Sequence, residues 1–423
     1  MNSACSFLPD LGTYVFLPWD ASNSLSPWFQ AGVEHQYGFN QLEARSAFDC
    51  CLENSPGHPL CYWGKSYAYG SFLNKPSCDA EDLAYAHEFA VKANEAMEGG
   101  GWDLSIVAQD LIKSSLKRFP EGDFDEADQV QNAVDFAAYL GANHNGDLDL
   151  LTHYAEAEMD VMAIRGEGYY TLNGEVNPGE PREEAVRAMD ALERVMGAGK
   201  GAADPQPLAL HLYIHITEPL SPGAGASKGE QSADALAAMN VTDSGHLLHM
   251  PGHLFMRTGR YNDVVQSNVL AHVADDLYDD KDMTPYGPAH NSYMGVAAAA
   301  LDGQSKWSVE YSGIIRDIFR GGDRDDSPGV EDGWNTLLTI YLRFGMWEEV
   351  VKDEYWRVPN EFGLKEGNYG DFLGAYCRGH AYWQLGEADK AEEMLAEMMD
   401  MTLDDKFVAR GKVAFITSPE ARR

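Results

Sequence analysis

Residues 370–395, GDFLGAYCRGHAYWQLGEADKAEEML, decide the fold of this chain. Gly379, Tyr382 and Gly386 have the spacing of two short helices that are joined by a tight turn. The same arrangement returns in WNTLLTIYLRFGMWEEV at residues 334–350, where a glycine again follows an aromatic side chain. Random helical sequence rarely places glycine and aromatic residues together at all these offsets. We therefore predict a helix-turn-helix unit that repeats along the chain.

The unit is similar to the tetratricopeptide repeat (TPR), whose helix pairs have a period of about 34 residues. Further matches lie within residues 44–67 and 252–264. The resemblance implies an all-α fold, a right-handed solenoid of helix-turn-helix repeats with long loops between helices. Segments rich in Gly, Pro, Asp and Asn are typical of such loops. These segments are 99–104, 165–182, 197–207, 219–233 and 320–329.

The chain of 423 residues is too long for one compact core of ordinary size, which also favours an array of repeats. We divide it into four parts. They are an N-terminal extension (1–27), N-terminal TPR-like repeats (28–140), central histidine-rich TPR-like repeats that carry the site (141–320) and C-terminal TPR repeats (321–423).

Composition excludes some classes of partner. The formal net charge of -36 disfavours binding to nucleic acid and to anionic membranes, because both are themselves negatively charged. The N-terminal residues lack the pattern of a signal peptide, and no apolar run reaches about 18 residues. The six cysteines lack zinc-site spacing, and we expect reduced thiols. The sequence thus predicts a soluble intracellular protein, in the cytoplasm or an organelle.

Three histidines fall within eight positions of HLLHMPGHLFMRTGRY, residues 246–261. The TPR resemblance implies that positions two, five, nine and twelve of the first helix in each pair face the concave groove. With Gly252 as the eighth position, His246, His249 and His253 occupy positions two, five and nine. We expect all three imidazoles to face the groove, unless Pro251 starts a new helix and displaces the first two.

A second set of residues on one helix face lies in LALHLYIHITEP. His211, His215 and Glu218 are spaced there at i, i+4 and i+7. In neighbouring repeats, His290 takes position two and Glu156 takes position nine. Converging imidazoles are an ordinary way to bind zinc and related ions. The predicted ligands are His211, His215, His246, His249, His253 and His290. They could hold one ion or two. The alternatives for each histidine are a hydrogen bond to a peptide, stacking on an aromatic ring, or a hydrogen bond to a buried backbone carbonyl group.

Four further residues are candidates for catalysis. Glu218 and Glu156 could act as additional ligands or as acid and base groups. Arg257, one turn after His253, could hold an anionic group, and Tyr213 could orient or protonate a substrate. For Arg257 and Tyr213, packing or surface exposure is the plainer explanation. The sequence lacks phosphate-loop, GxGxxG, HExxH and Ser-His-Asp patterns.

The segments HLYIHITE, GHLLHMPGHLFMRTGRYNDVV and HNSYMGVAAAALDGQS resemble a group of bacterial TPR-repeat proteins that carry these histidine motifs. The similarity extends from about residue 28 to about residue 310. This chain has Tyr293 where the group tends to have a histidine, so one ligand is lost or replaced by a phenol. The resemblance implies the fold and the location of the site, and it implies no reaction.

Our leading hypothesis is a metal-dependent enzyme that acts on a small polar metabolite, with the metal held in the groove. Iron or zinc is favoured by mixed nitrogen and carboxylate ligation, and copper or manganese is possible. A second hypothesis is an adaptor whose groove binds a peptide or partner protein. A third is metal storage or delivery without turnover.

Overall fold

The computed structural model describes a defined set of residues of the chain. They are residues 5, 8, 10, 12, 14–16, 25, 27–122, 126–173, 177–198, 206–221, 225–239, 241–279, 283–321, 333–359, 362 and 367–401. Most of these residues are helical, and one short pair of strands adds the rest of the regular structure. The prediction of a predominantly helical protein is confirmed.

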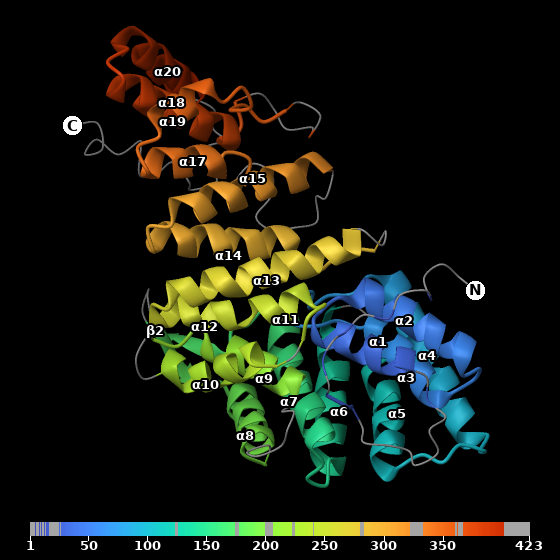
Figure 1. Cartoon of the computed structure of the whole chain (residues 1–423). Helices are drawn as coiled ribbons and strands as arrows, with labels where there is room; N and C mark the ends of the chain where they lie inside the picture. Colours follow the sequence, from blue (N-terminus) through green and yellow to red (C-terminus); the bar gives the residue numbers. More distant parts are fainter. Residues whose placement is uncertain are drawn as a thin grey trace. The chain divides into compact units, whose positions relative to one another are not determined.

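The chain forms two compact units, whose helices and strands are labelled in Figure 1. The first consists of Met1–Arg260 and Leu270–Tyr286, and the second consists of Tyr261–Val269 and Gly287–Arg423. Helix α13 (Tyr261–Asp279) contributes residues to both. The four-part division of the sequence stays a prediction.

In the first unit, consecutive helices pack against each other, as α1 and α2 or α3 and α4 do. Its helices are α1 (Pro27–Tyr37), α2 (Gln41–Asn54), α3 (Pro59–Tyr69), α4 (Ala80–Glu98), α5 (Ile106–Arg118), α6 (Glu126–Asn143), α7 (Leu148–Ile164), α8 (Glu183–Ala198), α9 (Pro207–Thr217), α10 (Ala226–Ala237), α11 (Gly245–His249) and α12 (Pro251–Thr258). Strands β1 (Tyr170–Asn173) and β2 (Asn177–Pro181) form an antiparallel hairpin inside the predicted loop 165–182.

The helix boundaries follow from local sequence. The side chain of Asp79 accepts a hydrogen bond from the backbone of α4, and Ser105 and Asp147 do the same for α5 and α7. Pro207 and Pro251 begin α9 and α12, where a missing backbone N–H costs little. Gly259 ends α12 with φ 81°, a left-handed conformation that glycine adopts without steric cost.

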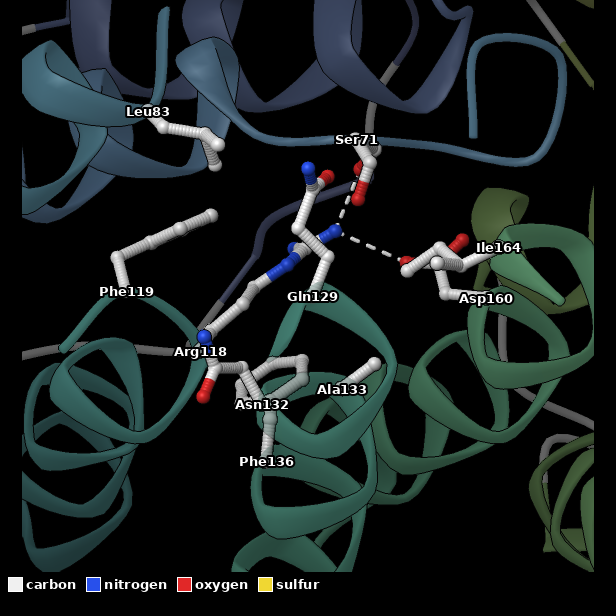
Figure 2. A pocket seen from close by; sticks show the side chains of 10 residues that line it. All are labelled: Ser71, Leu83, Arg118, Phe119, Gln129, Asn132, Ala133, Phe136, Asp160 and Ile164. Carbon is white, nitrogen blue, oxygen red and sulfur yellow. Dashed lines mark hydrogen bonds and ion pairs between the residues drawn. The ribbon is translucent and has the colours of Figure 1, made fainter. Parts of the chain in front are cut away.

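A buried ion pair joins three segments of the first unit (Figure 2). Nη2 of Arg118, at the end of α5, lies 2.9 Å from Oδ2 of Asp160 on α7. The same nitrogen donates to the backbone carbonyl of Ser71, just after α3. The rings of Phe119 and Phe136 flank the guanidinium group at 5.3 and 5.2 Å. This arrangement ties α3, α5 and α7 together.

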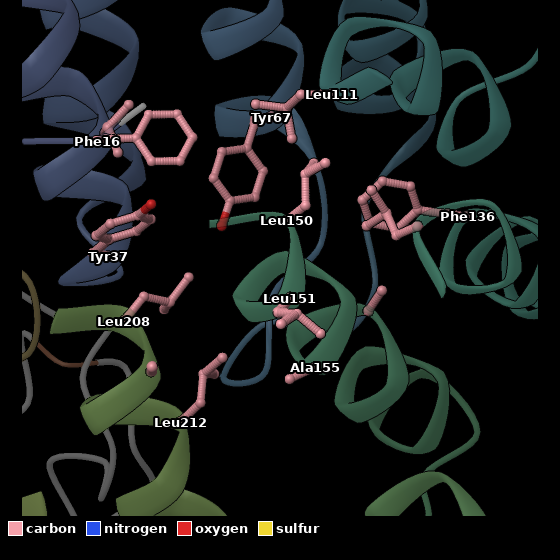
Figure 3. Packing of buried hydrophobic residues seen from close by; sticks show 14 of the residues in the cluster. Phe16, Tyr37, Tyr67, Leu111, Phe136, Leu150, Leu151, Ala155, Leu208 and Leu212 are labelled. Carbon is pink, nitrogen blue, oxygen red and sulfur yellow. The ribbon is translucent and has the colours of Figure 1, made fainter. Parts of the chain in front are cut away.

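The core of the first unit is rich in aromatic side chains (Figure 3). Phe16 stacks on Trp63 with ring centroids 5.8 Å apart and meets Tyr37 edge to face. From α9, Leu208 and Leu212 enter the same core and are fully buried. Because α9 is apolar on most of its circumference, it is enclosed by the fold, and His211 is buried with it, while His215 is partly exposed.

The second unit contains α14 (Pro288–Leu301), α15 (Ser305–Gly321), α17 (Thr336–Arg343), α18 (Trp347–Lys352), α19 (Tyr369–Gln384) and α20 (Ala388–Met401). Helices α19 and α20 are the pair expected from residues 370–395, and Gly386 makes the turn between them with φ 78°. Leu338, Val350 and Cys377 form a small core beside this pair.

The prediction of reduced thiols is wrong for four of the six cysteines. Cys5 is bonded to Cys50, and Cys51 is bonded to Cys61. The neighbouring Cys50 and Cys51 thus tie α2 to the N-terminal segment and to α3. Sequence spacing gave no sign of this pairing. The other two cysteines, Cys78 and Cys377, are buried thiols.

Within the described part of the chain, none of the helices combines the length and the apolar character that crossing a bilayer requires.

Candidate metal centre

Three helices of the first unit bring five of the predicted histidines together. His211 and His215 lie on α9, one turn apart, and His246 and His249 lie on the short α11. Pro251 ends that helix and begins α12, which carries His253. Pro251 thus begins a new helix, which is the alternative that the sequence left open. His211, His246 and His249 are nearly inaccessible to solvent.

The first pair is formed by His211 and His215. Nδ1 of His211 lies 2.7 Å from the carbonyl oxygen of Tyr37. Because a carbonyl only accepts, Nδ1 carries the proton and the Nε2 of neutral His211 presents a lone pair. Burial lowers the pKa of His211 to about 3, which keeps the ring neutral near pH 7. Its Nε2 lies 3.1 Å from Nε2 of His215.

His246 joins this first pair. Each of His211, His215 and His246 offers one ring nitrogen, and these nitrogens lie within 4.8 Å of one another. The ring centroids of His211 and His246 are 5.0 Å apart, almost the same as the 4.9 Å between His211 and His215. Three imidazole nitrogens gathered in this way could serve as the three protein ligands of a tetrahedral metal site.

The second pair is formed by His249 and His253, whose Nε2 atoms are 3.0 Å apart. Nδ1 of His253 lies 2.8 Å from Oε1 of Glu218. Burial acts to raise the pKa of Glu218, but the hydrogen bond and charge of His253 outweigh it, and the net pKa is lowered. Glu218 is therefore a carboxylate that accepts from Nδ1. It orients His253 through the nitrogen that faces away from His249.

The two sets of histidines lie side by side. His246 and His249 have ring centroids 5.8 Å apart, and His215 and His253 have centroids 6.3 Å apart. The five imidazoles therefore form one continuous cluster within the first unit. Sequence spacing predicts only which residues share a helix face, since the contact between α9 and α12 depends on tertiary packing.

Two aromatic residues that the sequence did not single out cover the cluster. The centroid of the Phe39 ring lies 4.4 Å from that of His211 and 5.3 Å from that of His246. The same ring stacks on His215, with the centroids 5.7 Å apart. Tyr286 meets His246 edge to face at 5.0 Å. Phe39 has φ 60°, an uncommon conformation for a bulky residue that is worth notice beside a candidate site. No pattern in the sequence marks it.

The other predicted site residues have different partners. Tyr213 donates to Glu193 over 2.8 Å, and Arg257 donates to the carbonyl of Leu220 over 3.1 Å. Arg257 also contributes to lowering the pKa of Glu218, so it acts on the edge of the cluster.

Glu156 lies in the aromatic core rather than in the clustered ligand set of the described residues. It accepts from the hydroxyl of Tyr67 and lies 3.2 Å from Nδ1 of His153. Burial acts to raise the pKa of Glu156, but the interactions with His153 and then Arg118 leave it lowered. The predicted role for Glu156 at the histidine centre gains no support from these contacts. His290 belongs to the second unit, near the start of α14, and its role stays a prediction.

No protein-family model matches this sequence, and a comparison with curated proteins gives no match. The resemblance to TPR proteins therefore rests on the motifs of the sequence itself.

Proposed function

We propose that this chain is a metal-dependent enzyme with a histidine-rich transition-metal centre, which acts on a small polar metabolite. In this proposal the helix pairs belong to a TPR-like right-handed solenoid, and the centre lies in its concave groove. One observation carries the proposal. In each histidine pair, an acceptor holds Nδ1 of one ring while the two Nε2 atoms approach to 3.1 or 3.0 Å.

This arrangement supports metal binding because histidines that bind metals usually donate their other N–H to a carbonyl or carboxylate group. The carbonyl of Tyr37 serves His211 in this way, and Glu218 serves His253. Nitrogens at about 2.0–2.1 Å from an ion lie about 2.9–3.4 Å apart when the angle between them is about 90–110°. An N–H···N hydrogen bond within each pair would give the same spacing, and metal analysis decides between the two.

The ligand set bears on the identity of the metal. The expectation of iron or zinc rested on a carboxylate ligand, either Glu218 or Glu156. The Glu218 carboxylate contacts the outer nitrogen of His253, and the Glu156 carboxylate accepts from Tyr67 in the aromatic core. Ligation by imidazole alone suits zinc and copper, and iron less well without a carboxylate. Manganese prefers oxygen ligands and fits worst. We therefore favour zinc or copper.

A bound ion would polarise a substrate oxygen or activate a water molecule. The chain itself would orient the rings through Tyr37 and Glu218 and exclude bulk water with Phe39 and Tyr286. Exclusion of water strengthens each electrostatic interaction inside the site.

A metal analysis of the purified full-length chain tests the proposal. We expect zinc or copper in stoichiometric amount, loss of that metal on treatment with a strong chelator, and return on adding the ion. A screen of small polar metabolites should then give turnover that follows metal content. Absence of metal before and after adding zinc or copper would contradict the proposal.

Storage or delivery of the metal without turnover is the second candidate, and one observation favours it. The pocket beside His246, lined also by Asp275, Tyr278 and Tyr286, has room for only about one water molecule. An organic substrate could reach the histidines through this pocket only if the residues that line it moved apart. Metal transfer to an apo acceptor protein, without turnover of any metabolite, would support this candidate.

The adaptor hypothesis predicts a different result. A groove that binds a peptide or protein partner would keep its affinity for that partner after chelation, and the purified chain would retain no stoichiometric metal. The same elemental analysis therefore separates the adaptor from both metal-dependent candidates.

A further inference from the structure

We infer that the five clustered histidines bind two metal ions in two neighbouring positions. The inference rests on the proposed metal-binding function and adds its stoichiometry. Position 1 consists of His211, His215 and His246, and position 2 consists of His249 and His253 with Glu218 behind His253.

The ring spacing within each position fits a shared ion. With nitrogen at about 2.0–2.1 Å from the ion, the centroid of each imidazole lies about 3.2 Å away. Two rings on one ion then have centroids about 4.5 Å apart at a right angle and about 5.2 Å apart at the tetrahedral angle. In position 1 the ring centroids of His215 and His246 lie 4.9 and 5.0 Å from that of His211, and in position 2 the centroids of the two rings are 4.8 Å apart.

The spacing between the positions does not fit a shared ion. His246 and His249 have centroids 5.8 Å apart, and His215 and His253 have centroids 6.3 Å apart. The centroids of two rings that bind one ion are about 6.4 Å apart only when the rings lie on opposite sides of the ion. The two ring pairs between the positions are this far apart, while the three measured pairs within them fit angles of about 100° at an ion, so two ions suit the arrangement better than one.

The supports of the two positions are also separate. The carbonyl of Tyr37 fixes His211 in position 1, and the carboxylate of Glu218 fixes His253 in position 2. Each position therefore has its own orienting acceptor, which a single site of five histidines would not need.

The two positions differ in charge. The ligands of position 1 are imidazoles alone, whereas a carboxylate contacts His253 in position 2. A carboxylate on the outer nitrogen of a ligating imidazole raises the basicity of that ligand, so Glu218 should strengthen the binding of an ion at position 2. The Glu218→Gln substitution should weaken position 2 by about 10–100-fold and leave position 1 unchanged.

The test is a titration of the metal-depleted full chain with zinc, and separately with copper(I), in competition with a chromophoric chelator, followed by elemental analysis. We expect two ions per wild-type chain. His215→Ala and His253→Ala should each retain one ion, and the double variant should retain none. The control is His272→Ala, since His272 is a partly exposed histidine of α13 that pairs with Asp276, and it should retain two.

The outcomes separate this inference from the proposed function. One ion in the wild type, or loss of all metal in either single variant, would overturn the two-ion inference and leave metal binding intact. No ion in the wild type would overturn both. Circular dichroism and thermal unfolding check the fold of each variant. Should an alanine variant fail to fold, His215→Gln and His253→Gln keep the volume of the side chain while removing the ring nitrogen, and the same counts apply.

Discussion

At the scale of single residues, Phe39 shows how a site depends on a side chain that carries no chemistry. Its ring lies against three imidazoles, and its backbone is held at φ 60°. Hydrogen bonds from the backbone N–H groups of Phe39 and Asn40 to the last turn of α1 maintain this conformation. The packing of the surrounding fold therefore sustains a backbone conformation that a bulky residue rarely adopts.

Removing that ring should affect the metal as well as the fold. We expect Phe39→Ala to destabilise the protein by roughly 3–5 kcal/mol, the usual loss for a buried phenylalanine, and to weaken metal binding because water reaches the imidazoles. Phe72→Ala is the control, since Phe72 is also buried and touches Phe39 and Tyr286. Denaturant unfolding and zinc titration measure both effects. Equal zinc affinity in the two variants would refute the role of Phe39.

The buried His35 gives a prediction about pH. Burial lowers its pKa from 6.5 to about 3. Below pH 6.5 the unfolded chain binds a proton at His35 that the folded chain does not bind. The contribution of His35 to the free energy of unfolding is therefore retained above pH 6.5 and is lost as the pH falls toward 3. In the metal-depleted protein, the free energy of unfolding of wild type should fall on going to pH 5. The fall should be smaller by roughly 2 kcal/mol in His35→Gln, which has no imidazole to protonate. Urea unfolding at pH 7.5 and pH 5 measures the difference, and identical acid sensitivity would contradict it.

At the scale of elements, the ion pair of Arg118 and Asp160 connects α5 to α7. Burial and the charge of Glu156 raise the pKa of Asp160, while Arg118 acts to lower it. Neither residue was recognised in the sequence, since an arginine at the end of one helix gives no sign of a partner 42 positions away.

We expect Arg118→Met to destabilise the first unit by roughly 3–5 kcal/mol, because it leaves buried carboxyl groups without their cation. The double variant Arg118→Met with Asp160→Leu should lose less free energy of unfolding than the single variant, since it also removes the buried carboxyl group of Asp160. Denaturant unfolding of the single and double variants provides the measurement. A double variant less stable than the single one would show that the ion pair is not what matters there.

At the scale of the whole molecule, the disulfides link the N-terminal segment and α3 to α2. Disulfides form mainly in oxidising compartments, so they weigh against the predicted cytoplasmic location, which stays a prediction. They also stabilise by restricting the unfolded chain, typically by about 2–4 kcal/mol each.

Counting thiols tests this pairing directly. Two cysteines are free and four are bonded, so the denatured chain should react with two equivalents of a thiol reagent before reduction and with six after it. Reduction should also lower the melting temperature. Six reactive thiols in the unreduced denatured chain would restore the original expectation of reduced cysteines.

The sequence by itself determined the features that local spacing controls. The helix pair around Gly386 and the i, i+4 pair of His211 and His215 follow from the helical period, because residues four positions apart lie on one face of any helix. The break at Pro251 also follows from local chemistry, since proline opens a helix more readily than it continues one.

Only the tertiary structure decided which partners meet across the chain. The carbonyl of Tyr37 reaches His211 from 174 residues away, and Glu218 reaches His253 from 35 residues away. Phe39 and the paired cysteines depend in the same way on how helices pack, and so does the position of Glu156 in the core. The helical period fixes which face a residue lies on, but packing between helices fixes what that face touches.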